Sequence, residues 1–274
     1  MSAETTAGRH HARPYSPDDP ELVAHFEQFG WVLTADIDTA DVAQVSGWVD
    51  EVASWADADG DWIHHRELTD EGPKLCRTEN FVPHHSGLRA LLTERLVHTA
   101  SRLLGEPAVL YKEKINYKLR GGAGFSPHQD APAYPFIDRH VSCMVAVDDA
   151  TVENGCLEVV DNRHHDLLPT DERGCIEQTF VEQMQWHPVE LVAGQTLWFH
   201  SRTPHRSKAN HSTRDRRALY PTYNASSAGN LRDDYYRTKI AALAERDGGG
   251  RVVVSLIGDF EGRPVEESTP TQVQ

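Results

Sequence analysis

The chain has 274 residues, of which 39% are hydrophobic and 25% are charged, and its formal net charge is −15. These values are ordinary for a globular protein, and the length allows a core that needs no disulfide or structural metal. No apolar stretch is long enough to span a bilayer, and an acidic surface repels the phosphates of a nucleic acid. We therefore expect neither a membrane nor a nucleic acid as a partner.

The cysteine pattern indicates the kind of cellular compartment in which the protein works. The chain has four cysteines and no C-x-x-C pair, which indicates buried free thiols in a reducing compartment. Residues 1–14 are polar and lack the apolar segment of a secretory signal, so we expect a cytoplasmic protein. We predict a disordered tail at 1–14, one domain at 15–265 and a flexible tail at 266–274. The oligomeric state stays open.

The first predicted elements are a short helix and a strand. Residues 21–29 have the pattern of a helix, and Gly30 provides the signal that ends it. Residues 31–33 (W-V-L) then read as a strand.

Two further helices are predicted before the chain changes character. Thr39 or Asp41 is expected to cap a helix that runs to about Trp55, because valines recur there at helical spacing. Leucines mark one face of a third helix over about 87–104, which Gly105 ends.

The second part of the chain consists of short β-rich runs bounded by Gly, Pro or Asn. These runs are 109–119, 141–147, 156–160, 189–191, 196–199 and 218–223. Helices that precede many short strands suggest a β core with helices packed outside it. We therefore predict a mainly β fold, a double-stranded β-helix (jelly roll) with helical cover.

A glycine-rich segment leads into a possible metal-binding motif. Residues 121–130 read G-G-A-G-F-S-P-H-Q-D. On a strand, residues two apart point to the same face, so His128 and Asp130 could reach one metal ion. An imidazole and a carboxylate, with one more histidine, form the facial triad of non-haem iron(II) oxygenases. H-x-D alone is a weak signal, because it also occurs in ordinary surface strands.

Two later residues strengthen this interpretation. His205 follows an apolar strand and a proline turn, where it can face back across a β sandwich. Arg216 lies farther along, in a run that reads as a strand. An arginine that points inward needs an anionic partner, and the distal carboxylate of a 2-oxo diacid can supply one.

In this order, the motifs resemble those of the phytanoyl-CoA dioxygenase family of 2-oxoglutarate-dependent oxygenases. The resemblance covers most of residues 20–225. It includes H-Q-D at 128–130, E-N-G-C-L at 153–157 and the block at 205–223. It implies an enzyme that couples decarboxylation of 2-oxoglutarate by O2 to hydroxylation of a C–H bond.

The resemblance also implies a role for individual residues. Fe(II) would be bound by His128, Asp130 and His205. The far carboxylate of 2-oxoglutarate would be bound by Arg216 and the hydroxyl of Ser207, and O2 would take the remaining position on the metal. Related halogenases have a small residue in place of the carboxylate, so Asp130 favours hydroxylation.

Alternatives to two of these residues remain. His200 or His211 could replace His205, although the family's spacing favours His205. Arg217 could replace Arg216; because neighbours on a strand face opposite ways, only one of them can enter the pocket. A non-catalytic metal-binding jelly roll and a metal-free structural domain are the competing functions. The first needs no arginine at this spacing, and the second predicts no bound iron.

The substrate is suggested by a cationic strand face. Lys112, Lys114, Asn116 and Lys118 alternate along a strand that leads into the iron segment. We predict that Lys112 and Lys114 bind a small anionic substrate and that Asn116 contacts the co-substrate, although a solvated face is the ordinary interpretation of such lysines.

The loop that follows the iron segment adds a possible lid. Tyr134, with Phe136, is predicted to contact the substrate from there, whereas Trp198 and Phe199 are expected to be core residues. These segments resemble the branch of the family that hydroxylates small phosphonates such as aminoethylphosphonates. A natural-product or amino-acid-like carboxylate is the alternative substrate.

Overall fold

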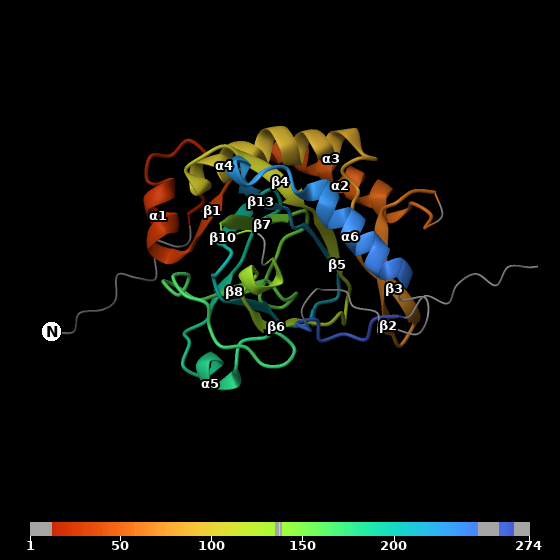
Figure 1. The fold of residues 1–274 in the computed structure, drawn as a ribbon. Helices are drawn as coiled ribbons and strands as arrows, with labels where there is room; N and C mark the ends of the chain where they lie inside the picture. The colour runs from red at the N-terminus through yellow and green to blue at the C-terminus, as the bar shows by residue number, and fades with distance from the viewer. Residues whose placement is uncertain (1–12, 58, 135–136, 138, 246–257, 266–274) are drawn as a thin grey trace, which may run out of the picture.

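The computed structural model describes residues 13–57, 59–134, 137, 139–245 and 258–265. Its antiparallel sheets with helices outside confirm the predicted mainly β fold (Figure 1). The tails predicted at 1–14 and 266–274 lie outside the described residues, except Arg13 and Pro14. The four cysteines are free and buried, as predicted. No helix in these ranges has the length and apolar character to cross a membrane.

Helices are concentrated in the first part of the chain. They are α1 (Leu22–Phe29), α2 (Thr39–Ala53), α3 (Ser86–Ala90), the π-helical turn η2 (Leu91–Arg95), α4 (Leu96–Leu104), the 3-10 turn η3 (Ala131–Ala133), α5 (Gln178–Val181), the 3-10 turn η4 (Ser226–Ala228) and α6 (Arg232–Glu245). The strands are β1 (Trp31–Thr34), β2 (Ile63–Thr69), β3 (Gly72–Glu79), β4 (Ala108–Lys112), β5 (Lys114–Lys118), β6 (Phe125–His128), β7 (His140–Ala146), β8 (Leu157–Val159), β9 (His187–Val189), β10 (Thr196–His200), β11 (His205–Ser207), β12 (Arg216–Leu219) and β13 (Thr222–Ala225).

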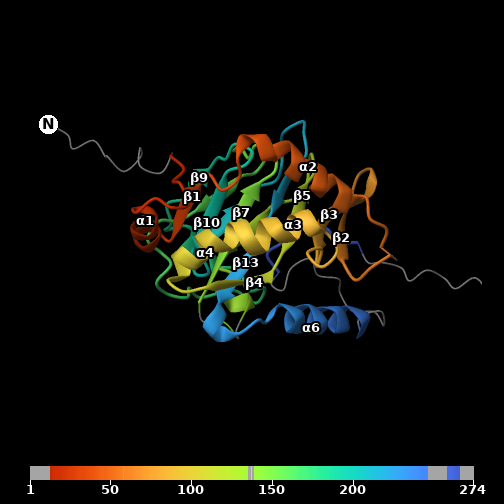
Figure 2. The same ribbon diagram turned by 90° about the horizontal axis from the view of Figure 1, so that it is seen from above.

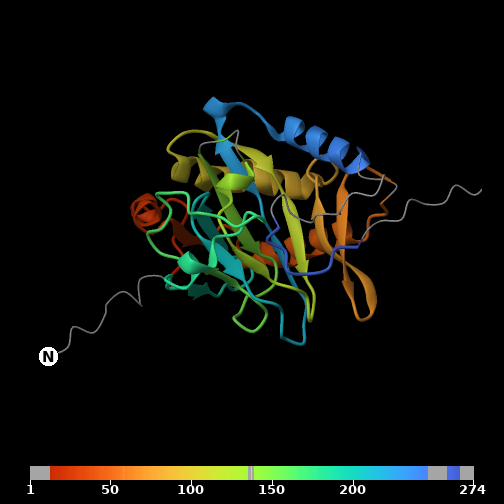
Figure 3. The same cartoon turned by 60° about the horizontal axis from the view of Figure 1, so that its bottom comes forward.

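These strands form two sheets. The larger has the order β1-β10-β7-β12-β5-β3-β2, with β13 paired to β7 and β4, and the smaller has the order β6-β11-β8-β9. Figure 3 brings the side of the smaller sheet forward. Apolar side chains from both sheets pack together between them, including Met144 and Phe199 from the larger and Leu157 and Val159 from the smaller. The two sheets therefore enclose a hydrophobic core between them, and the candidate metal site lies in the same interior.

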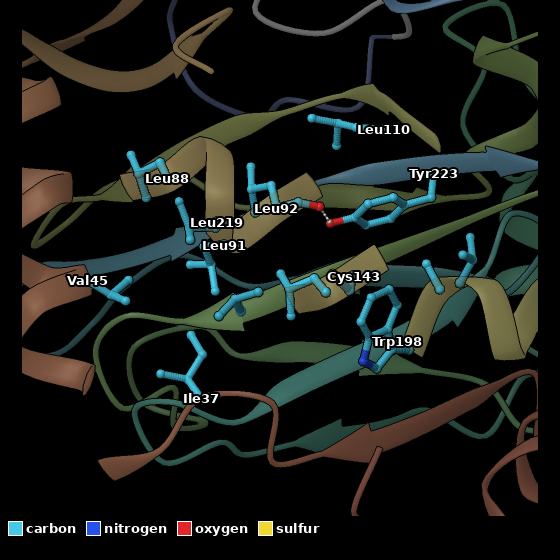
Figure 4. Packing of buried hydrophobic residues seen from close by; sticks show 14 of the residues in the cluster. Ile37, Val45, Leu88, Leu91, Leu92, Leu110, Cys143, Trp198, Leu219 and Tyr223 are labelled. Atoms are coloured by element: carbon cyan, nitrogen blue, oxygen red, sulfur yellow. Dashed lines mark hydrogen bonds between the residues drawn. The ribbon is translucent and has the colours of Figure 1, made fainter. Parts of the chain in front are cut away.

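Helices cover the outer face of the larger sheet. In Figure 2, α3 and α4 run across its strands, and leucines from this helical run belong to the same buried cluster as Tyr223 and Trp198 (Figure 4). The hydroxyl of Tyr223 donates a hydrogen bond to the Leu92 carbonyl oxygen at 2.8 Å. Trp198 is fully buried here, as expected of a core residue. This packing makes the larger sheet a rigid wall for the site.

Glycine ends two of the helices, as predicted. Gly30 and Gly105 have φ of +82° and +72°, in the left-handed region where a side chain is unfavourable. A Cβ at Gly30 would also lie 2.4 Å from Nδ1 of His164, so the position requires glycine. The predicted cap of α2 was wrong by one residue, because Asp38 is the N-cap and Thr39 is the first helical residue.

Three predicted strands differ from the observed ones. The run 109–119 is two strands, β4 and β5, which break at Glu113. The run 218–223 breaks at Pro221, which has no N–H to continue a ladder. Of the run 189–191, only Val189 belongs to a strand, because β9 ends at this residue. Neither the β2–β3 hairpin nor α6 was predicted.

Candidate metal centre and adjoining cavity

A strand register brings two distant histidines together. His128 ends β6 and lies opposite His205, the first residue of β11, in an antiparallel pair. Paired residues of neighbouring strands direct their side chains to the same face. The two imidazole rings therefore meet, with centroids 4.1 Å apart, and both side chains are buried.

Asp130 joins these histidines by a route that the sequence did not indicate. It does not lie on the strand as predicted; it follows β6 with helical φ and ψ and precedes η3. Its Oδ1 is 3.9 Å from Nε2 of His205, and its Oδ2 accepts a hydrogen bond from the Ser142 hydroxyl at 2.6 Å. One potential ligand atom from each of His128, Asp130 and His205 lies within 4.8 Å of the other two.

The tautomers of both histidines suit a metal. Nδ1 of His128 donates to the Ser126 carbonyl oxygen at 2.7 Å, and Nδ1 of His205 donates to the Thr203 carbonyl oxygen at 3.0 Å. A carbonyl oxygen only accepts, so each Nδ1 carries a proton, and in the neutral form of each ring Nε2 presents the lone pair. Divalent metals bind the imidazole in this form.

The charges of the cluster also suit a metal. Burial, followed by the neighbouring His128, lowers the pKa of His205 to about 4, so this ring is neutral near neutral pH. Burial alone would raise the pKa of Asp130, but His205 and Lys112 outweigh it and hold this pKa well below its usual value. The imidazoles of His128 and His205 and the carboxylate of Asp130 are the donor set of a facial triad.

The alternative histidines lie elsewhere. His211 is exposed. Nδ1 of His200 accepts a hydrogen bond from the backbone N–H of Arg202 at 3.1 Å, and its ring packs near Phe26 and His164. Neither belongs to the cluster found among the described residues.

Arg216 is a buried cation without a carboxylate partner in the described part of the chain. It is 2% exposed on β12, its Nη1 donates to the sulfur of Met144 at 3.7 Å, and its Nε has no hydrogen-bond acceptor there. The alternative, Arg217, faces the other way and pairs with Asp148 at 2.7 Å and with Asp50. A bound anion would satisfy Arg216.

A second buried cation lies directly across the strand pair from Arg216. Lys118 of β5 is the register partner of Arg216, and its ammonium donates to the Ser207 hydroxyl at 2.8 Å. Burial and then Arg216 lower the pKa of Lys118 well below its usual value. Sequence reasoning placed Lys118 on the cationic face but gave it no role, because nothing in the motif indicates its pairing with Ser207.

A cavity adjoins the metal cluster. Its lining includes the three ligand candidates, Ser207, Phe199 and, from the predicted cationic face, Lys112, Lys114 and Asn116. The amide oxygen of Asn116 accepts a hydrogen bond from Nε of Arg77 at 2.9 Å, which fixes its side chain.

Of the two lysines, Lys112 is buried and Lys114 is partly buried. Burial and then Lys114 lower the pKa of Lys112 well below its usual value, and burial and then Arg77 lower the pKa of Lys114 to about 8. Tyr134 is buried, and the Lys112 ammonium lies 4.1 Å from its ring centroid. Tyr134 thus packs behind Lys112 and does not line the cavity. Phe136 lies outside the described residues.

One acidic residue in the lining has no counterpart in the sequence interpretation. Asp259 comes from the short C-terminal segment 258–265, and its Oδ2 is 3.3 Å from Nε2 of His128. No recognisable motif surrounds Asp259, and it lies far from the iron segment in sequence.

Residues 26–218 match the family described as phytanoyl-CoA dioxygenase (PhyH). The chain belongs to the phytanoyl-CoA dioxygenase family. It is a dioxygenase that depends on Fe(II) and 2-oxoglutarate and acts on a small molecule, as the sequence interpretation predicted.

Individual members of this family are similar over most of the chain. The methylphosphonate hydroxylase of Gimesia maris is 42% identical over 248 residues, which cover 89% of this chain and 95% of the relative. The 2-aminoethylphosphonate dioxygenase of an uncultured bacterium is 39% identical over 201 residues, or 71% of this chain and 77% of the relative.

Comparison with solved structures identifies the fold. The crystal structure of EctD from S. alaskensis with 2-oxoglutarate and 5-hydroxyectoine has a TM-score of 0.67 at 20% identity, over 80% of this chain and 81% of that one. This dioxygenase therefore shares the fold of EctD, and the predicted double-stranded β-helix is confirmed.

Proposed function

We propose that this dioxygenase hydroxylates a C–H bond of a small phosphonate. The observation that carries the proposal is the pair Lys112 and Lys114. Both line the cavity beside the metal-ligand candidates. Asp130 acts on the pKa of both, but no carboxylate of the described residues lies within 4.0 Å of either ammonium. Two ammonium groups in a buried cavity match the concentrated negative charge of a phosphonate. The similarity to two phosphonate-oxidising relatives supports the same class of substrate.

His128, Asp130 and His205 hold Fe(II) in this proposal. The fit rests on two free Nε2 lone pairs and one carboxylate, oriented by hydrogen bonds from their other atoms. When bound, the iron supplies activation of O2, with 2-oxoglutarate as the source of electrons. The protein's share is to orient these ligands and to leave part of the coordination sphere open.

Arg216 and Ser207 bind the distal carboxylate of 2-oxoglutarate, and Asn116 contacts the same molecule. A 2% exposed guanidinium without a carboxylate partner in the described chain supports this assignment. We add Lys118 to the group, because its ammonium already contacts the Ser207 hydroxyl. The co-substrate's carboxylate would then neutralise two buried cations that otherwise repel each other.

Lys112 and Lys114 bind the phosphonate group, and Tyr134 acts through Lys112. The Tyr134 ring holds the Lys112 ammonium by a cation–π contact at 4.1 Å. Phe199 and Leu157 supply apolar walls to the same cavity. These walls exclude water from the C–H bond that reacts, which strengthens the electrostatic contacts made there.

An assay of succinate release tests the proposed function. The protein, loaded with Fe(II), is supplied with 2-oxoglutarate and O2 and with methylphosphonate, 2-aminoethylphosphonate, L-proline or no further substrate. We expect succinate to rise with at least one phosphonate and a product heavier by one oxygen atom. Turnover with L-proline and with no phosphonate would favour a carboxylate substrate instead.

We further propose that residues 15–265 form one domain and that the enzyme is cytoplasmic and binds neither a membrane nor a nucleic acid. The support is a net charge of −15 and four buried free thiols, which suit a reducing compartment. Size-exclusion chromatography and limited proteolysis test the domain boundaries, and a stable fragment of 15–265 is the expected result.

A further inference from the structure

The backbone of Asp259 is fixed against the strand that carries His128. The backbone N–H of Ser126 donates to the Asp259 carbonyl oxygen at 2.7 Å, and Phe260 forms an antiparallel bridge with Phe125. Glu261, two residues on, accepts a hydrogen bond from the Ser126 hydroxyl at 3.0 Å. The Asp259 backbone is therefore fixed beside β6, and its side chain lines the cavity.

One oxygen of this carboxylate is buried without a hydrogen-bond partner in the described part of the chain. Asp259 is 3% exposed, and its Oδ1 has no partner there. Its Oδ2 lies 3.3 Å from Nε2 of His128, but Nε2 is the nitrogen offered to the metal, because Nδ1 donates to Ser126, and a ring that binds a metal through Nε2 cannot donate from it. A buried carboxylate without a donor is costly, so a cationic donor from outside the chain is expected.

Asp259 lies outside the group of metal-ligand candidates. The cluster whose ligand atoms all lie within 4.8 Å of one another consists of His128, Asp130 and His205, and Asp259 is not part of it. The charge of Asp259 raises the pKa of Lys114, but among the described residues the ion-pair contact that Asp259 makes within 4.0 Å is with His128 and not with a lysine. The carboxylate thus lies beside the metal cluster and faces the space left for substrate.

The cavity consequently has opposite charges on its two walls. Lys112 and Lys114 belong to the larger sheet, whereas Asp259 is fixed to β6 of the smaller sheet. A substrate with an anionic end and a cationic end would satisfy both walls. Methylphosphonate has only the anionic end, but an aminoalkylphosphonate has both.

We infer that Asp259 binds the ammonium group of an aminoalkylphosphonate and so determines specificity for substrates with an amino group. This inference rests on the proposed function, because the phosphonate end is assigned to Lys112 and Lys114. With one end held by each sheet, the carbon chain of the substrate spans the cavity beside His128. Asp259 is a substrate-binding residue and does not bind the metal.

Asp259→Asn tests the inference, since it removes the charge and keeps the shape. Binding is measured by calorimetry without O2, on protein loaded with zinc and 2-oxoglutarate, for 2-aminoethylphosphonate and for ethylphosphonate, which has the same length and no amino group. We expect the variant to lose at least about 30-fold in affinity for 2-aminoethylphosphonate, as for a broken buried charge pair. Its affinity for ethylphosphonate and its zinc content should stay the same.

Glu261→Gln is the matched control, because it removes a carboxylate from the same segment outside the lining of this cavity. It should bind both phosphonates as the wild type does. Equal losses for both ligands in Asp259→Asn, or a loss of zinc, would overturn the inference. Wild-type protein that binds ethylphosphonate but not 2-aminoethylphosphonate would also overturn it and leave the proposed function standing. Wild-type protein that binds and turns over no phosphonate would overturn both.

Discussion

His128 and His205 lie directly opposite each other on β6 and β11, with their ring centroids 4.1 Å apart. Their pairing depends on one strand register, and backbone carbonyl oxygens fix both tautomers. Because the two rings come from separate parts of the chain, the ligand set forms only when the jelly roll has formed.

Ser142→Ala should weaken metal binding. The Ser142 hydroxyl donates to Oδ2 of Asp130 at 2.6 Å and so orients a proposed ligand. Loss of such a supporting contact typically costs about 10–100-fold in metal affinity. Competition with a chromogenic chelator measures this change. Ser201→Ala is the control, because the Ser201 hydroxyl is buried with no hydrogen-bond partner in the described chain; equal losses in both variants would refute the role of Ser142.

Arg216→Gln should raise the Kd for 2-oxoglutarate by at least about 30-fold, since it removes one member of a buried charge pair. Arg217→Gln should leave this Kd unchanged, because Arg217 faces outward and pairs with Asp148 and Asp50. Calorimetry on the zinc-loaded variants measures both values. If Arg217→Gln caused the larger loss, the assignment of the co-substrate site would be wrong.

The phosphonate reaction should lose efficiency at high pH. Burial and Arg77 lower the pKa of Lys114 to about 8, so this lysine is charged below that pH and neutral above it. The cavity loses a cation as the pH rises, and kcat/KM for the phosphonate, which reports groups of the free enzyme, should fall above about pH 8. In Lys114→Arg the cation persists, so the fall should disappear. An unchanged fall in Lys114→Arg would mean that another group causes it.

Arg232→Met should destabilise the fold by about 3–5 kcal/mol, because it leaves the buried Glu113 carboxylate without its partner. Glu113 is 0% exposed, and its Oε2 accepts from Nε of Arg232 at 3.0 Å. Burial already raises the pKa of Glu113, so without Arg232 the carboxyl should be protonated more easily and the loss should be smaller at low pH. Urea unfolding measures the change; a pH-independent loss would contradict this explanation.

Local signals in the sequence predicted some elements well. Helices ended at Gly30 and Gly105, where the backbone has positive φ, and the apolar run that contains Trp198 formed a buried strand. The spacing of H-x-D also brought Asp130 to the cluster, although through a helical turn after β6 and not through strand alternation. In these places the residue's own conformational preference decides the structure.

Long-range contacts decided the elements that were missed. The helix α6 contacts the fold through ion pairs, with Lys239 bonded to Glu79 at 2.6 Å and Arg232 bonded to Glu113. Its sequence therefore has no apolar stripe from which a helix could be predicted. Strand β2 consists mostly of polar and histidine side chains, some of which are buried in the folded protein. It therefore lacks the apolar pattern that would predict a strand. Asp259 reaches the site only because the backbone of segment 258–265 is hydrogen-bonded to β6.

The most direct test of the central claim is the visible spectrum of the anaerobic protein with Fe(II) and 2-oxoglutarate. We predict a weak charge-transfer band for the wild type, its loss in His205→Ala, and its retention in His211→Ala, since His211 is exposed and outside the cluster. A band that survives in His205→Ala, or that the wild type never shows, would contradict binding of the iron by His128, Asp130 and His205.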